Sequence, residues 1–235
     1  MSQGTKSDSA CRKSFLTLWK RMEIKMADLE IFQKTLGELS TNCYIMVNHD
    51  TNECIVFDPA DEAQVLKEIF DHPEFKLQAI FLTHGHHDHI GAVKALKDYY
   101  NVPIYASKEE NDQVLTKVGV NLSVMFGKPM TLEADELLRD GQKVEIIGTT
   151  LECILTPGHT AGGMCYYCEE MKSLISGDTL FCESVGRTDF PTGSGMELER
   201  SVREKLFVLP EDTKVFPGHM NMTTIGWEKE NNPYF

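Results

Sequence analysis

The hydrophobic pattern of the chain alternates between short strand-like runs and stretches with helical spacing. Apolar and β-branched runs bounded by turn-like residues predict strands. Such runs occupy residues 42–47, 53–57, 79–82, 143–147, 150–155, 163–168, 173–176 and 214–216. Apolar residues three and four positions apart predict helices, the first of them with Asp61 as its N-cap. These helices are expected within residues 61–70, 91–99, 112–118 and 196–206.

The chain divides into a short basic segment and one long globular stretch. No internal repeat, low-complexity tract or linker interrupts residues 28–235, so we predict one domain there. Residues 1–25 hold six Lys or Arg against two Asp or Glu, without an apolar pattern matched to the core. We expect residues 1–27 to be a disordered N-terminal extension. An organellar transit peptide, or a start codon upstream of Met22 or Met26, is the alternative.

The net charge of the chain limits the classes of partner that it is expected to bind. Asp and Glu outnumber Lys and Arg by 36 to 23, for a formal net charge of −13. Such a charge disfavours non-specific binding of nucleic acid and docking on anionic membranes. No run of 18 apolar residues is present, so no membrane-spanning helix is predicted. We expect a small-molecule substrate, no nucleic-acid or membrane partner, and an oligomeric state that the sequence leaves open.

The seven cysteines are interpreted as free thiols. An odd number spread over a chain of 235 residues is unlike a disulfide framework. Free thiols suit a reducing compartment, and we predict a cytoplasmic location. Cys165 and Cys168 have CxxC spacing inside a predicted strand. We interpret them as structural residues, with a redox pair or a metal site as alternatives.

Candidate chemistry concentrates in the segment L-T-H-G-H-H-D-H at residues 82–89. It follows a short predicted strand, and loops at the C-terminal ends of strands are where α/β folds build their sites. His84, His86, Asp88 and His89 all offer lone pairs to a metal ion. His84 and His86 are two positions apart, so in extended backbone they point the same way. This density of ligand-type residues has little structural use, and it predicts a metal site.

Three further loops share one layout, in which a predicted strand and a small residue precede a ligand-type residue. They supply His159 in T-P-G-H-T, Asp178 in S-G-D-T and His219 in P-G-H. Each motif is weak alone, but together they provide the ligands that the first loop lacks. Of the remaining histidines, His49 and His72 are interpreted as surface residues. His87 is interpreted as a surface residue or as a loop residue that faces away from the ligands.

These motifs together resemble those of the metallo-β-lactamase superfamily. The resemblance rests on Asp58 in F-D-P and on the seven ligand-type residues above, and it covers about residues 28–235. A finer similarity is to the short, single-domain glyoxalase II-like (hydroxyacylglutathione hydrolase-like) hydrolases. It rests on G-D-T-L-F at 177–181, S-V-G-R-T-D-F at 184–190, and the segments 35–44 and 223–235. The resemblance implies an α+β fold, the four-layer αβ/βα sandwich of this superfamily.

The same resemblance implies a site for two divalent metal ions, zinc first, with iron or manganese as alternatives. In that arrangement, His84, His86 and His159 hold one ion, Asp88, His89 and His219 hold the second, and Asp178 bridges both. Asp58 and Thr83 would fix the ligand loop, a role that such neighbouring groups often have.

Two adjacent divalent ions imply a hydrolase. Metal lowers the pKa of bound water, so a bridging hydroxide would attack an acyl carbonyl whose oxygen a metal stabilises. Asp88 or Asp178 would hold the proton of the hydroxide, and these are the candidate catalytic residues. A thiolate leaves with little protonation, so the predicted reaction is hydrolysis of an acyl thioester such as S-lactoylglutathione.

Other functions on the same fold remain open. A mononuclear iron persulfide dioxygenase would use His84, His159 and Asp178 as a two-His-one-carboxylate site, and those enzymes have a similar G-R-T-D-F segment. Nucleic-acid hydrolysis, as in tRNA-processing members, is disfavoured by the negative charge. A non-catalytic binding module is disfavoured by the complete set of ligands.

Two departures from the glyoxalase II pattern concern the substrate side of the site. Met220 follows His219 where that group usually has Gly, so the loop loses a permissive backbone position. Full-length glyoxalase II enzymes add a C-terminal helical domain with cationic contacts to glutathione, whereas this sequence ends 16 residues after His219. Arg187 is the candidate substrate contact in its place, with a structural ion pair to Asp189 as the alternative.

Overall fold

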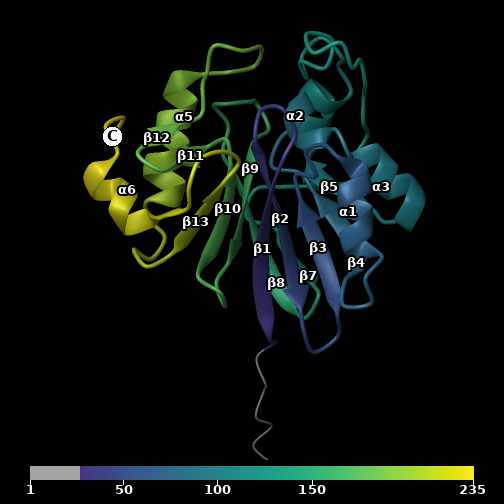
Figure 1. The fold of residues 1–235 in the computed structure, drawn as a ribbon. Helices are drawn as coiled ribbons and strands as arrows, with labels where there is room; N and C mark the ends of the chain where they lie inside the picture. Colours follow the sequence, from purple (N-terminus) through teal and green to yellow (C-terminus); the bar gives the residue numbers. More distant parts are fainter. Residues whose placement is uncertain (1–26) are drawn as a thin grey trace, which may run out of the picture.

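The structure, a computed structural model, describes residues 27–235 and contains two six-stranded sheets (Figure 1). The first has the order β1-β2-β3-β4-β5-β6: β1 (Leu29–Leu36), β2 (Thr41–Asn48), β3 (Glu53–Phe57), β4 (Lys76–Phe81), β5 (Ile104–Ser107) and β6 (Glu136–Leu138). The second has the order β14-β13-β10-β9-β8-β7: β7 (Lys143–Ile146), β8 (Thr149–Leu155), β9 (Met164–Cys168), β10 (Ser173–Gly177), β13 (Lys214–Pro217) and β14 (Thr223–Thr224). A separate hairpin joins β11 (Leu180–Phe181) to β12 (Ser184–Val185).

Helices cover the outer face of each sheet. Those of the first half are α1 (Ala63–Phe70), α2 (His87–Ile90), α3 (Val93–Tyr100), α4 (Lys108–Glu110) and the π-helical turn η1 (Asn111–Leu115). Those of the second half are α5 (Gly195–Ser201), the π-helical turn η2 (Val202–Leu206) and α6 (Ile225–Asn231). In Figure 1, α1 and α3 lie outside the first sheet, and α5 and α6 lie outside the second.

Three buried apolar clusters hold these layers together. Tyr44, Phe81 and Tyr166 belong to the cluster between the two sheets. A second cluster packs the first sheet against α1 and α3, with Leu96 fully buried, and a third packs the second sheet against η2 and α6, with Val202 fully buried. Two sheets face to face with helices on both outer faces form the predicted four-layer αβ/βα sandwich, which is confirmed.

Most predicted strands and helices are present, and the differences have local causes. Strand β1 was not predicted because it is an edge strand, most of whose residues are exposed, so it lacks an apolar run. The N-cap of α1 is Glu62 at φ 51° and not Asp61, whose carboxylate accepts a hydrogen bond from the Glu62 N–H. The helix predicted at 112–118 starts earlier, at α4, and its π-helical turn ends at Leu115.

The CxxC pair is structural, as interpreted. Cys165 is buried in the cluster between the second sheet and its helices, whereas Cys168 is buried in the cluster between the sheets. Residues three apart in a strand point to opposite faces, so the two thiols cannot pair or share an ion. The six cysteines within residues 27–235 are all free thiols.

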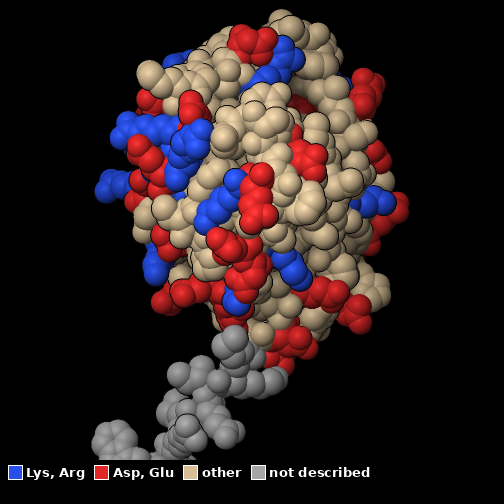
Figure 2. All heavy atoms as spheres, turned by 90° about the vertical axis from the view of Figure 1, so that its left-hand side faces the viewer, with Lys and Arg blue, Asp and Glu red and all other residues tan. Residues whose placement is uncertain are grey.

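The structure also bears on the expectations about membrane spans, surface charge and the N-terminal extension. Within residues 27–235, no helix is long and apolar enough to cross a bilayer. On the face that contains α5 and α6, basic and acidic side chains are interspersed, with pairs such as Arg200–Glu204 and Arg203–Glu199 (Figure 2). The expected N-terminal extension lies outside the described residues except for Ala27.

Candidate metal centre

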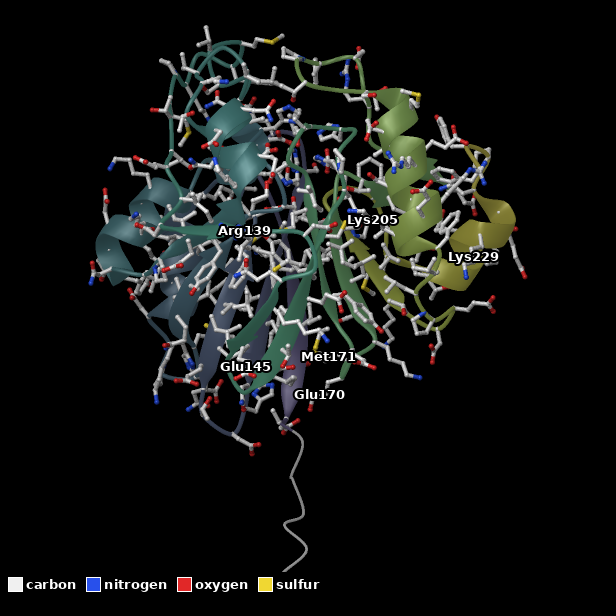
Figure 3. The ribbon with its side chains drawn as sticks, turned by 180° about the vertical axis from the view of Figure 1, so that it is seen from behind. Arg139, Glu145, Glu170, Met171, Lys205 and Lys229 are labelled. Atoms are coloured by element: carbon white, nitrogen blue, oxygen red, sulfur yellow. The ribbon has the colours of Figure 1, made fainter. Side chains whose placement is uncertain are left out.

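The ligand-type residues meet at one edge of the sandwich, beside α2 at the top of Figure 1. His84 and His86 follow β4, and Asp88 and His89 lie in α2. The other three follow strands of the second sheet: His159 follows β8, Asp178 follows β10 and His219 follows β13. Lys205, seen from behind in Figure 3, donates to the carbonyl of Leu155 and fixes the end of β8 from which the His159 loop departs.

The seven residues form two groups with one carboxylate between them. The ligand atoms of His84, His86 and His159 lie within 4.8 Å of one another, and so do those of Asp88, His89 and His219. The Asp178 Oδ1 atom is 3.4 Å from His89 Nε2. Its Oδ2 atom is 3.6 Å from the Nε2 atoms of both His159 and His219. The structure therefore brings together both sets that the resemblance implied, with the Asp178 carboxylate between them.

Hydrogen bonds fix the orientation of three imidazoles. The Nδ1 atom of His89 lies 2.9 Å from Asp58 Oδ2, that of His84 lies 3.1 Å from Thr83 Oγ1, and that of His159 lies 2.6 Å from the carbonyl oxygen of Arg187. Since carbonyl and carboxylate oxygens only accept, the rings of His89 and His159 donate from Nδ1. The Nε2 atom of His89 is then directed into the site without a hydrogen-bond partner, and that of His159 lies 2.9 Å from Nδ1 of His86, within the first donor group.

Asp58 and Thr83 hold the first ligand loop, as expected. Asp58 Oδ1 accepts from the Thr83 N–H at 2.7 Å, and Oδ2 accepts from the Thr83 hydroxyl at 2.5 Å. Asp58 also forms a third ligand-type group with His84 and His89. Because both its oxygens are already engaged, we assign Asp58 to orienting the loop and His89.

The His219 loop is held by residues that the sequence did not single out. The Tyr44 hydroxyl donates to the Pro217 carbonyl at 2.8 Å, and Asn42 Nδ2 donates to the carbonyls of Pro217 and Met220 at 3.0 Å. Met220 adopts φ 66°, so the loop keeps a left-handed residue although it has no Gly at that position. The ligand position of His219 is preserved.

Glu110 is a buried carboxylate that the sequence analysis missed. Its Oε1 accepts from the Gly85 N–H at 2.7 Å, and its Oε2 accepts from the Thr160 hydroxyl at 2.8 Å and the Gly162 N–H at 3.1 Å. Gly85 lies between His84 and His86, and Thr160 follows His159. Burial raises the pKa of Glu110 to about 7, although these three hydrogen bonds lower it. Glu110 thus joins the two loops that supply the first donor group.

The residues present fit a divalent metal ion. The Nε2 atoms of His84, His86 and His89 and the Oδ1 atom of Asp178 are buried without a hydrogen-bond partner. Burial, and then neighbouring imidazoles, lowers the pKa of His84 well below its usual range, so its ring is neutral. At His89, burial lowers the pKa, but Asp178 and the other carboxylates raise it to about 10. The carboxylates therefore favour positive charge here, which a cation bound to imidazole and carboxylate donors supplies.

His87 belongs to neither donor group, although its Nδ1 atom lies 3.7 Å from Asp88 Oδ1. Its ring stacks on Phe126 with centroids 3.8 Å apart, and it lines a neighbouring cavity of about 370 Å³. The interpretation of His87 as a residue facing away from the ligands agrees with this geometry, although its side chain is only 11% exposed.

We expect His87→Ala to leave metal content unchanged, because no donor group includes His87. The substitution removes the stack on Phe126, which is worth about 0.5–1.5 kcal/mol, and the 3.7 Å approach of His87 Nδ1 to Asp88 Oδ1. Asp88 Oδ2 keeps its contacts with Thr41 and His219. Metal analysis of the purified variant beside His86→Ala tests this. A loss of metal as severe as that in His86→Ala would contradict the assignment.

A cavity of about 440 Å³ opens above the two donor groups. Its floor includes the ligand-type residues His86, Asp88, His159, Asp178 and His219. Seven apolar side chains form what we call the apolar wall: Leu39, Leu122, Phe126, Phe181, Val185, Phe190 and Met220. The remaining lining residues are Ser184 and Arg187.

Comparison with known proteins gives a consistent result. The family model of the metallo-beta-lactamase superfamily matches residues 36–219. Hydroxyacylglutathione hydrolase GloC of Haemophilus influenzae is 34% identical over 219 residues, covering 91% of this chain and 98% of that protein. The crystal structure of BLEG-1 B3 metallo-beta-lactamase is similar with a TM-score of 0.82 at 38% identity, covering 87% of this chain and 99% of that one. TTHA1623 in a di-iron-bound form gives 0.77 at 32% identity, covering 87% and 100%.

Proposed function

This chain belongs to the metallo-beta-lactamase superfamily, and from that premise we propose that it is a metal-dependent hydrolase of acyl thioesters. The observation that carries the proposal is the pair of complete donor groups with Asp178 between them. A divalent ion bound there would lower the pKa of water and polarise a carbonyl. The 34% identity to a relative named hydroxyacylglutathione hydrolase supports a thioester as substrate.

We assign the donors as two sets. His84, His86 and His159 would hold one ion, Asp88, His89 and His219 would hold the other, and Asp178 lies where it could contact both. Zinc suits imidazole and carboxylate donors. Iron or manganese is the alternative, and the similar TTHA1623 structure, described as di-iron-bound, supports iron in particular.

The side chains around the cavity suit a leaving group that needs no proton. In hydrolysis, the oxygen of water bonds to the acyl carbon, the C–S bond breaks, and its electron pair leaves on sulfur. The proton released by water passes to the carboxylate of Asp88 or Asp178. A thiol has a pKa near 8.5, so sulfur leaves as the thiolate.

An amine or alcohol would need a proton donor as it leaves. Apart from the proposed ligands, the titratable group among the described lining residues is Arg187, whose guanidinium does not release a proton. A leaving amine would therefore have to recover the proton held by Asp88 or Asp178, a transfer that a thiolate does not need. This favours a thioester over the β-lactam amide that the likeness to BLEG-1 B3 metallo-beta-lactamase would suggest.

Metal analysis of the purified protein combined with S-lactoylglutathione turnover tests the proposal. We expect two ions per chain and a KM toward or above the upper end of the usual range of about 1 μM–1 mM, because the acidic chain repels this substrate, whose two carboxylates outweigh its one ammonium group. Added salt should lower KM by screening. Hydrolysis of no thioester would contradict the proposal. One iron per chain with oxygen consumption on glutathione persulfide would instead indicate the dioxygenase.

Arg187 tests how the substrate is held. Its Nε and Nη2 atoms each donate to Asp189 at 2.7 Å, and its guanidinium lies 3.8 Å above the Phe190 ring. We therefore expect Arg187→Ala to change kcat/KM for charged and uncharged thioesters alike, with metal content unchanged because its carbonyl still accepts from His159. A rise in KM confined to glutathione thioesters would show that Arg187 binds substrate.

A further inference from the structure

The cavity has a polar floor and apolar sides. The apolar wall comes from five separate segments: the β1–β2 turn, the loop after η1, the β11–β12 hairpin, the segment before α5 and the His219 loop. At the rim, Leu39 is 45%, Phe126 41% and Met220 58% exposed. When apolar side chains from distant parts of the chain line one cavity, they indicate a surface that a bound ligand covers.

The same surroundings offer no free positive charge among the described lining residues. Arg187 is engaged on both sides, by Asp189 and by the Phe190 ring. In the adjoining 370 Å³ cavity, Lys128 lies 2.9 Å from Asp61, and Glu38 adds a further carboxylate. This cavity and the main one share Leu39, Asp88 and Phe126, so a substrate that extends sideways meets the same surroundings.

A glutathione thioester fits these surroundings poorly. Its two carboxylates lie several bonds from the sulfur, so with the thioester on the floor they reach the sides of the cavity. Carboxylates there would be desolvated against apolar groups without a cationic partner. An uncharged hydrocarbon group in the same place would bury surface that is otherwise exposed to water.

Resting on the proposed thioesterase function, we propose that the preferred substrate is a thioester with an apolar, uncharged acyl group that lies against the apolar wall. The thiol portion of the preferred substrate carries no carboxylate near the sulfur. Among the described lining residues other than the proposed ligands, Ser184 is the only uncharged polar side chain, so the cavity offers few hydrogen bonds to an acyl group. The acyl group is therefore selected by its size and hydrophobicity.

A series of thioesters on one uncharged thiol measures this preference. Acetyl, butanoyl, hexanoyl and octanoyl thioesters of N-acetylcysteamine differ only in chain length. We expect kcat/KM to rise about 3- to 4-fold per added methylene, the factor equivalent to burying one methylene, until the cavity is filled. Hexanoylglutathione, compared with the N-acetylcysteamine ester of the same acyl group, should give a kcat/KM lower by about 10-fold or more at low salt.

Variants of the wall separate substrate contact from net charge. Phe126→Arg places a cation on the wall, whereas Val124→Arg adds the same charge to an exposed position in the same loop outside either cavity. We expect Phe126→Arg to flatten the dependence on acyl length and to raise the glutathione-to-N-acetylcysteamine ratio by about 10-fold. Val124→Arg should leave that ratio within about 2-fold. Leu39→Arg repeats the test from the β1–β2 turn, and metal content shows that each variant has an intact site.

The outcomes distinguish this inference from the function on which it rests. A kcat/KM independent of acyl length, or equal or better turnover of the glutathione ester, overturns the apolar substrate while leaving thioester hydrolysis in place. A metal-loaded protein that cleaves none of the thioesters overturns the proposed function. Equal effects of Phe126→Arg and Val124→Arg would show that long-range charge decides selectivity, and this also overturns the inference.

Discussion

Asp178→Asn is expected to lower metal content and thioester hydrolysis together, with kcat/KM falling by more than 100-fold. Removal of groups that only support a metal ligand already costs about 10- to 100-fold. Asp178 approaches imidazoles of both donor groups, at 3.4 Å from His89 and 3.6 Å from His159, and its Oδ1 atom has no hydrogen-bond partner. Asp58 also lies near one imidazole of each group, but both of its oxygens are engaged by hydrogen bonds. Asn keeps the shape but removes the negative charge. Metal analysis and steady-state kinetics on the same preparation measure both effects.

The matched control for this substitution is Asp212→Asn. Asp212 is exposed, pairs with Lys172 and lies outside the donor groups. Its substitution by Asn therefore removes the same negative charge without changing the site. We expect it to keep its metal content and turnover. A variant of Asp178 with two ions per chain and near-normal turnover would show that the carboxylate does not contact both ions.

Glu110→Gln is expected to weaken metal binding by about 10- to 100-fold, although Glu110 belongs to neither donor group. The carboxylate accepts from Gly85 and from Thr160 and Gly162. A Gln side chain keeps one acceptor oxygen, and its NH₂ group then faces backbone or hydroxyl donors. The loops that position His86 and His159 consequently separate. Titration of the metal-free protein with Zn²⁺ measures the affinity directly.

Two controls separate positioning from a general loss of stability. Glu109→Gln changes the neighbouring residue, which is only partly buried and outside this network. Val202→Ala destabilises the remote cluster around η2 without altering the ligand loops. If Val202→Ala loses as much metal affinity as Glu110→Gln at equal destabilisation, Glu110 has only a structural role.

The chemistry-bearing residues could be predicted because they are dense in the sequence. Four ligand-type side chains lie within residues 84–89, directly after a predicted strand, and this pattern can be recognised without knowledge of the fold. The support for these residues leaves no such pattern. Ser107 and Glu110 have the spacing of a capping box, and Ser107 does cap α4, but the Glu110 side chain turns inward to Gly85. That direction depends on loops that only the tertiary fold brings together.

The substrate side was the hardest part to predict from sequence. Arg187 drew attention because it was a lone cation in a matched motif, and the structure pairs it with Asp189. The sequence gives no sign that Phe126 and Leu39 line a cavity, because single apolar residues in loops are common in any sequence. Their relation to Asp88 appears only when both lie at the same cavity. Strand β1 shows the same limit, since pairing with β2 and not its own pattern makes it a strand.

The site draws on both halves of the chain, and this sets when it can form. The segment after β4 of the first sheet supplies His84, His86, Asp88 and His89, while loops after strands of the second sheet supply His159, Asp178 and His219. During synthesis, the first half therefore emerges with an incomplete set of donors. Full affinity arises only after the last loop docks on Asn42 and Tyr44. We therefore expect metal capture to be a late step of maturation, and a bound ion would stabilise the docked halves by about 4 kcal/mol at 1,000 times its dissociation constant. Chelation should accordingly increase hydrogen exchange first along the seam between β2 and β13.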